Sequence, residues 1–147
     1  LTKDQDYDVR NLAMFGLGSI YEGDTPEIRQ ALIEGTDDTD MEIRCEALIG
    51  LANRQDDRVI SLLLREWASQ DDVCIMSLEA AQIISSPRLY TELLHLSQTL
   101  HCTNDKSFTE QLHSAIDACK PKLTLISTPT TVAPPSLDER ESETDDL

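Results

Sequence analysis

Residues 8–18 read DVRNLAMFGLG, and residues 42–52 read EIRCEALIGLA. Both stretches give, in order, an acid, a β-branched residue, an arginine, two spacers, an alanine, two spacers, a glycine, a leucine and a small residue. A weaker copy occupies residues 72–81 and a degenerate one residues 108–116, and the anchors of the four copies lie 34, 30 and 35 residues apart. Repetition at such a period indicates a helical repeat protein.

A second set of segments lies between these copies. Its anchors are Ile28, Val59 and Leu89, which are 31 and 30 residues apart. Two interleaved sets with nearly one period predict a two-helix unit that recurs along the chain. One such hairpin cannot bury its apolar face alone, so neighbouring hairpins should stack into a continuous core.

Each segment has helical spacing. Val9, Ala13 and Leu17 recur at i, i+4 and i+8, on one face of a helix. Glycine inside a helix costs about 1 kcal/mol relative to alanine, so Gly16 and Gly50 predict a packing requirement. The small residues that should let adjacent hairpins approach closely are Ala13, Gly16, Ala47, Gly50, Ala80 and Ala81.

The helix starts are marked by capping residues. Pro26 and Pro87 suit a first helical turn, where the missing N–H has no helical partner. The expected N-caps are Thr25, Ser86, Asp40 and either Asp71 or Asp72. The predicted helices cover 7–21, 26–35, 41–53, 57–68, 72–84, 87–100 and 106–119. The predicted fold is therefore an all-α solenoid of about 3.5 hairpins.

The chain divides into two regions. Residues 1–122 form the predicted repeat domain. The remaining residues, 123–147, are predicted to be a flexible tail, because they combine proline, serine and threonine with six acids and one arginine. A docking peptide is the alternative function for this tail. Because the first residue is Leu1 rather than Met, we expect a fragment or a processed chain, and the repeat stack could continue N-terminal to it.

The formal net charge of −16 excludes nucleic acid as an expected partner, since its binding depends on basic residues that neutralise phosphates. No apolar run is long enough to cross a membrane, and no signal peptide is visible. The four cysteines lack metal-type spacing and are expected to be small buried hydrophobes of a reducing cytoplasm. We expect no catalytic residue, cofactor or metal. His101 and Cys102 are the only neighbouring base and nucleophile, and adjacent helical residues point apart.

The repeats resemble HEAT-like repeats of the phycobilisome-lyase type. The pattern Asp-x-x-Val-Arg-x-x-Ala is matched by Val9-Arg10 with Ala13 and by Ile43-Arg44 with Ala47, and more loosely at Val73. The resemblance covers residues 6–119 and implies a right-handed superhelix whose second helices line the concave side. Some members of this family attach bilin pigments to antenna proteins, and others are adaptors.

The second helices predict a binding surface. Their polar positions at i, i+3 and i+7 should align into one strip, in which three arginines could pair with a partner's carboxylates. This polar strip consists of Glu27, Gln30, Glu34, Arg58, Ser61, Arg65, Arg88, Thr91 and His95. An ordinary solvated helix face is the alternative. Trp67 and Tyr90 are expected either in the core or, if exposed, as aromatic anchors of this surface.

Arg10 and Arg44 are expected to belong to the scaffold and to pair with acids such as Asp40 or Asp71 at hairpin turns. The predicted function is a non-enzymatic scaffold or adaptor that binds another protein in a bacterial cytoplasm. The alternative is a relative of a bilin lyase that cradles pigment and acceptor protein.

Overall fold

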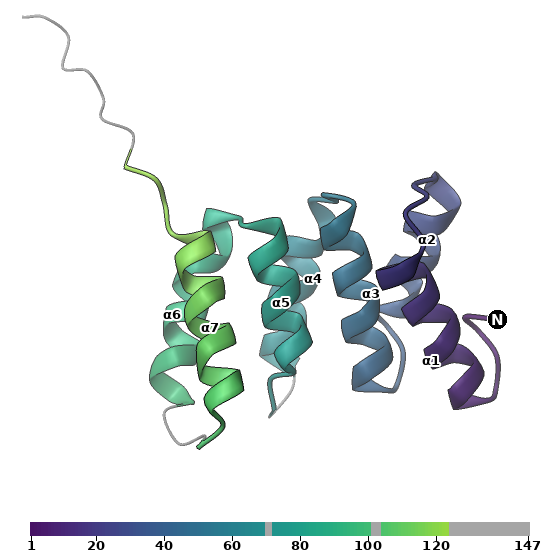
Figure 1. Cartoon of the computed structure of the whole chain (residues 1–147), viewed down its shortest axis with the longest axis horizontal. Helices are drawn as coiled ribbons and strands as arrows, with labels where there is room; N and C mark the ends of the chain where they lie inside the picture. Colours follow the sequence, from purple (N-terminus) through teal and green to yellow (C-terminus); the bar gives the residue numbers. More distant parts are fainter. Residues whose placement is uncertain (70–71, 101–103, 124–147) are drawn as a thin grey trace, which may run out of the picture.

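The computed structural model describes residues 1–69, 72–100 and 104–123. Over these ranges the chain is all-α, and its helices follow one another side by side along one axis (Figure 1). The elements are α1 (Tyr7–Phe15), the π-helical segment η1 (Gly16–Ile20), α2 (Pro26–Gly35), α3 (Met41–Asn53), α4 (Arg58–Ser69), α5 (Ile75–Ile84), the 3-10 turn η2 (Pro87–Leu89), α6 (Tyr90–Thr99) and α7 (Lys106–Cys119). The predicted solenoid is confirmed.

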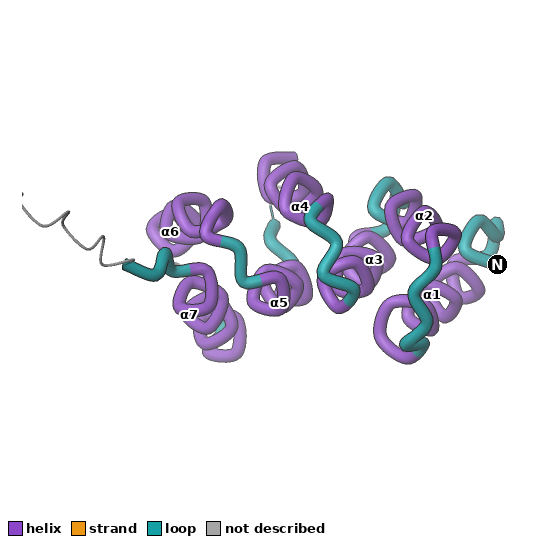
Figure 2. Tube along the Cα trace, turned by 90° about the horizontal axis from the view of Figure 1, so that it is seen from above, coloured by secondary structure: helices purple, strands orange, loops and turns teal. Residues whose placement is uncertain are grey.

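The helices form two layers, with α1, α3, α5 and α7 in one and α2, α4 and α6 in the other (Figure 2). Successive first helices contact one another directly, whereas the second helices pack mainly against first helices. The layer of first helices is therefore the more closely spaced, and the stack bends towards it (Figure 2). The second helices do not line the inner side of the curve, contrary to what the family resemblance implied.

Capping residues set most helix starts as predicted. The hydroxyl of Thr25 accepts a hydrogen bond from the N–H of Ile28 at 3.3 Å, which caps α2. The carboxylate of Asp40 accepts from the first turn of α3, and the hydroxyl of Ser86 caps η2. These bonds satisfy N–H groups that have no partner inside the helix.

The start of α5 differs from the prediction. The helix begins at Ile75, and its N-cap is Cys74 with an extended backbone rather than Asp72. Val73 packs against the core from the segment before this cap, so the chain stays extended past the acids. The other expected cap, Asp71, lies outside the described residues.

Glycine packing joins the first two hairpins at a different residue from one of those predicted. A Cβ at Gly50 would lie 2.7 Å from the Cα of Gly18, and a Cβ at Gly18 would lie 2.5 Å from the carbonyl oxygen of Glu46. A Cβ at Gly16 would meet nothing within 4 Å. The requirement predicted for Gly50 is confirmed, and the partner surface is Gly18 rather than Gly16, because η1 and not α1 crosses α3 there.

Arg54 fastens the end of η1 to the next hairpin. Its guanidinium donates to the carbonyl oxygens of Leu17 at 2.9 Å, Tyr21 at 2.6 Å and Gly23 at 2.9 Å. It also donates to the carbonyl oxygen of Gly50 at 2.9 Å. These bonds occupy carbonyl groups that the end of a helix leaves without partners.

Arg10 and Arg44 belong to the scaffold, as expected, but pair with different acids. Arg10 Nε lies 3.0 Å from a carboxylate oxygen of Asp38, and Arg44 Nη2 lies 3.0 Å from Glu66. Asp40 caps α3 instead, so its carboxylate is turned towards backbone N–H groups. The pairs join α1 to the turn before α3, and α3 to α4.

Candidate functional site

All nine residues of the polar strip are exposed on α2, η2, α4 and α6. Two of its three arginines, however, pair with acids of the scaffold. Arg58 makes two hydrogen bonds to Asp56, at 2.9 and 2.6 Å, and Arg65 lies 2.9 Å from Asp37. The positive charge that was expected to distinguish this surface is therefore largely compensated.

Part of the polar strip does come together across two hairpins. Gln30 and Arg58 line one open pocket at the starts of α2 and α4. The carboxylate of Asp56, beneath this pocket, is contacted by both Arg58 and Arg29, and these hydrogen bonds lower its pKa. The pocket is thus a closed network of internal ion pairs.

The two aromatic residues differ in exposure. Trp67 is 6% exposed, and its indole N–H donates to the hydroxyl of Ser77 at 2.8 Å in the core. It is therefore not an anchor of an exposed surface. Tyr90 is half-buried and also packs against the core.

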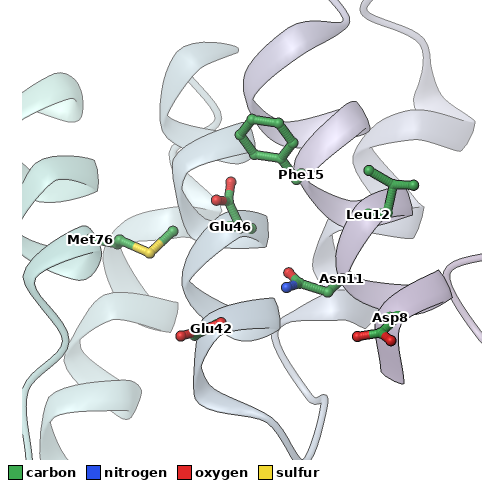
Figure 3. A pocket seen from close by; sticks show the side chains of 7 residues that line it. All are labelled: Asp8, Asn11, Leu12, Phe15, Glu42, Glu46 and Met76. Carbon is green, nitrogen blue, oxygen red and sulfur yellow. The ribbon is translucent and has the colours of Figure 1, made fainter. Parts of the chain in front are cut away.

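A different surface has the features of a binding site. An open pocket of about 280 Å³ lies on the layer of first helices, between α1, α3 and α5 (Figure 3). We call it the inner pocket, because the stack bends towards this layer. It is lined by Asp8, Asn11, Leu12, Phe15, Glu42, Glu46 and Met76.

The apolar side chains of the inner pocket lie on its two sides. Leu12 and Phe15 come from α1 and are 72% and 41% exposed. Met76 comes from α5, across the pocket from them (Figure 3). A leucine exposed to this extent beside an exposed phenylalanine loses the burial free energy that apolar side chains usually contribute to folding.

The middle of the inner pocket is acidic. Glu42 and Glu46 lie one helical turn apart on α3, between the apolar sides (Figure 3). Tyr7 donates its hydroxyl to Glu42 at 2.9 Å, and Ser19 donates to Glu46 at 2.9 Å. Both donors are neutral, and the lining residues include no lysine or arginine.

Glu46 is held in an unfavourable electrostatic environment. Burial raises its pKa above the ordinary value of a glutamate, and the neighbouring carboxylates of Glu79 and Glu42 raise it further. The hydrogen bond from Ser19 acts in the opposite direction and does not outweigh them. A carboxylate in these surroundings would be stabilised by a nearby cation.

Sequence reasoning missed the inner pocket. It assigned the α1 face through Val9, Ala13 and Leu17 to the core and gave no role to Leu12 and Phe15. These two apolar residues are three apart and lie off that face, which was the available signal. Their position opposite the glutamates of α3 depends on how the hairpins stack, which the sequence pattern does not specify.

The cysteines only partly match the expectation of burial. Cys45 and Cys119 are buried, whereas Cys74 is half-buried at the start of α5. The thiols of Cys45 and Cys74 hydrogen-bond with each other, which lowers the pKa of Cys74 and raises that of Cys45. The fourth cysteine, Cys102, lies outside the described residues together with His101.

Two further observations concern the extent of the chain. The predicted tail falls outside the described residues from position 124 onward. Among the residues that the structure describes, no helix is both long and apolar enough to cross a membrane.

Comparison with known proteins identifies the family. A family model described as HEAT repeats matches residues 1–96. Protein YibA of Escherichia coli K12 is 37% identical over 123 residues, which cover 82% of this chain and 40% of YibA, and YibA of strain O157:H7 gives the same values. A crystal structure of E. coli YibA aligns with a TM-score of 0.65 and 35% identity, covering 81% of this chain and 41% of that one.

The chain therefore spans about 40% of the length of these curated relatives. The match to the family model includes the first six helices of the stack, α1 to α5 and most of α6. On the evidence of this match and of the two-layered stack of helical hairpins, the chain belongs to the HEAT-repeat family.

Proposed function

We propose that this chain is a non-enzymatic scaffold that binds another protein through the inner layer of its helical stack. The observation that carries the proposal is the exposure of Leu12 and Phe15 beside the uncompensated glutamates of the inner pocket. Exposed apolar side chains gathered at a hollow and bordered by charged groups are typical of protein interaction sites.

The size and shape of the inner pocket favour a protein over a small molecule. Sites for small molecules are usually enclosed and have volumes of ~300–1,000 Å³. The inner pocket, at about 280 Å³, lies at the lower end of this range and is open to solvent along the helices. Such a hollow suits one or two side chains of a longer segment that continues beyond it.

The polar strip supports the same function less strongly. Its charges are largely satisfied by internal pairs such as Arg58 with Asp56 and Arg65 with Asp37. Exposed pairs of this kind add little to stability, yet a partner would have to break them before it could use the arginines. Arg88 is the strip arginine for which this cost does not arise among the described contacts.

The test compares partner capture by surface variants of the intact chain. The chain is immobilised and incubated with a lysate of its source organism, and the bound proteins are identified by mass spectrometry. One variant carries Leu12→Ser and Phe15→Ser. A second variant carries Arg58→Glu, Arg65→Glu and Arg88→Glu. Circular dichroism confirms that all three forms are equally helical.

The proposal expects a partner that the intact chain and the arginine variant retain and that the Leu12→Ser, Phe15→Ser variant loses. A partner lost only by the arginine variant would keep the scaffold function and move its site to the polar strip. If no form retains a protein, the scaffold function is wrong.

Two finer assignments also belong to this proposal. We propose membership of the phycobilisome-lyase type within the HEAT repeats, on the Val-Arg and Ala spacing of Val9-Arg10 with Ala13. We also propose a cytoplasmic location, where the thiols of Cys45 and Cys74 would stay reduced. A pigment cradle would shift the visible absorbance band of an added bilin, and the scaffold function expects no such shift.

A further inference from the structure

The inner pocket combines two kinds of surface that one side chain can contact together. Leu12 and Phe15 offer apolar surface on one side, and Met76 offers it on the other (Figure 3). The carboxylates of Glu42 and Glu46 lie between them. Arginine has the matching construction, since its methylene stem packs on apolar groups and its guanidinium binds carboxylates.

We infer that the inner pocket receives an arginine side chain from a basic, amphipathic segment of a partner protein. This inference rests on the proposed function and names the chemistry of the partner. The guanidinium would bind the glutamates of α3, and the apolar neighbours of the arginine in the partner would cover Leu12 and Phe15.

The charge around the inner pocket supports a cationic occupant. Glu42 and Glu46 accept hydrogen bonds from the neutral groups of Tyr7 and Ser19, and no salt bridge to either glutamate is found within the described residues. Glu79 adds a further carboxylate close enough to act on Glu46. A cation in the pocket would supply the missing charge, and its own desolvation would be offset by two carboxylates.

Geometry favours arginine over lysine at this position. Glu42 and Glu46 are separated by one helical turn, so a planar group with several N–H donors can contact both. Phe15 lies beside them and offers a ring on which a guanidinium can stack. An ammonium group is a compact point charge and would satisfy fewer of these contacts.

Segments of the same chain fit the inner pocket less well. The tail from Leu123 to Leu147 carries six acids and one arginine, so its net charge repels the glutamates. A second copy carries the same net charge of −16, and its Arg58 and Arg65 are already paired with their own acids. The charge balance therefore points to a different, basic protein.

The experiment selects ligands without assuming the partner. A displayed library of random 12-residue peptides is panned against the full chain, and enriched peptides are synthesised with a fluorophore. Their affinities are measured by fluorescence anisotropy for the intact chain and for a Glu42→Gln, Glu46→Gln variant. The matched control carries Glu27→Gln and Glu34→Gln, which removes the same charge from the exposed face of α2.

We expect enriched peptides to contain an arginine next to large apolar residues. The Glu42→Gln, Glu46→Gln variant should weaken their binding roughly tenfold or more, and the control variant by less than roughly twofold. Replacement of the peptide arginine by the neutral analogue citrulline should cause a loss like that of the double variant, and replacement by lysine a smaller loss.

Other results would overturn the inference in distinguishable ways. Enriched peptides without arginine, or peptides that bind the Glu42→Gln, Glu46→Gln variant equally well, would leave the scaffold function and reject the arginine site. Peptides lost on Arg58→Glu, Arg65→Glu and Arg88→Glu would do the same. A dimer in size-exclusion chromatography that the Glu42→Gln, Glu46→Gln variant dissociates would assign the pocket to a second copy. Enrichment of no peptide at all would count against both proposals.

Discussion

The guanidinium of Arg44 lies against the carboxylate of Glu66 in a buried ion pair that joins α3 to α4. Nε of Arg44 is 3.1 and 3.0 Å from the two carboxylate oxygens, and Nη2 is 3.0 Å from one of them. Nη1 donates to the carbonyl oxygens of Asp38 and Thr39. The pair therefore has its hydrogen bonds satisfied and ties the hairpin to the turn before it.

Removal of Arg44 should destabilise the fold strongly. An Arg44→Met variant leaves the carboxylate of Glu66 buried, at 7% exposure, without its cation. Breaking a buried pair in this way costs about 3–5 kcal/mol, which urea unfolding followed by circular dichroism would measure. Arg88→Met on the exposed face is the control and should change stability by less than about 0.5 kcal/mol. Equal effects of the two variants would show that the pair does not support the fold.

The glycines of the first two repeats should respond in opposite directions to alanine. Gly50→Ala would place a Cβ 2.7 Å from both Gly18 and Leu32, and such overpacking costs about 1–3 kcal/mol. Gly16→Ala meets nothing within 4 Å and should stabilise the chain by up to about 1 kcal/mol. Thermal unfolding of both variants checks the prediction, and a stable Gly50→Ala variant would contradict the close approach.

These residues show how far the sequence predicts the fold. The repeat period, helix order and caps at Thr25 and Asp40 follow from local patterns, because each depends on residues a few positions apart. The identity of the glycine that meets Gly50 does not, because Gly16 and Gly18 sit in equivalent local sequence. The choice between them depends on the π-helical turn that begins at Gly16 and changes which residue faces α3.

Cys74 should be the most reactive thiol among the described cysteines. The hydrogen bond from Cys45 lowers the pKa of Cys74, so its thiolate fraction is larger than that of an ordinary cysteine below the usual pKa. We expect iodoacetamide near pH 7 to modify Cys74 before Cys45 and Cys119, as mapped by peptide mass spectrometry. A Cys45→Ser variant, whose hydroxyl offers a different donor, should change the pH at which Cys74 reacts. Preferential modification of Cys119 would contradict the prediction.

Glu46 should cost stability at neutral pH. Because its pKa is raised in the folded protein, the folded state holds this proton more tightly than the unfolded chain does. The favourable contribution is therefore present at low pH and is lost as the pH rises through the folded pKa. A Glu46→Gln variant keeps an acceptor for Ser19 and should be more stable than the parent at pH 7, with a smaller difference at pH 4.

Urea unfolding at the two pH values measures this difference. Greater stability of Glu46→Gln combined with weaker ligand binding would be the pattern of a residue retained for function at the expense of stability. Lower stability of the variant at pH 7 would show that Glu46 contributes to the scaffold instead.

The candidate site was less predictable than the fold. The exposure of all nine residues in the polar strip follows from helical periodicity, and it agrees with the structure. The pairing of Arg58 and Arg65 with acids in neighbouring turns does not follow, because it depends on side chains brought together by the stacking of hairpins. The inner pocket was missed for the same reason, since its walls come from three different repeats.

Site-specific photo-crosslinking tests the central claim, that the layer of first helices binds a protein partner. p-Benzoylphenylalanine is placed at Leu12 in one form of the chain and at Thr91 in another, since both positions are exposed but lie on opposite layers. After irradiation in the source lysate, we predict a crosslinked partner from position 12 and none from position 91. Crosslinking from position 91 alone, or from neither position, would contradict this account of the protein.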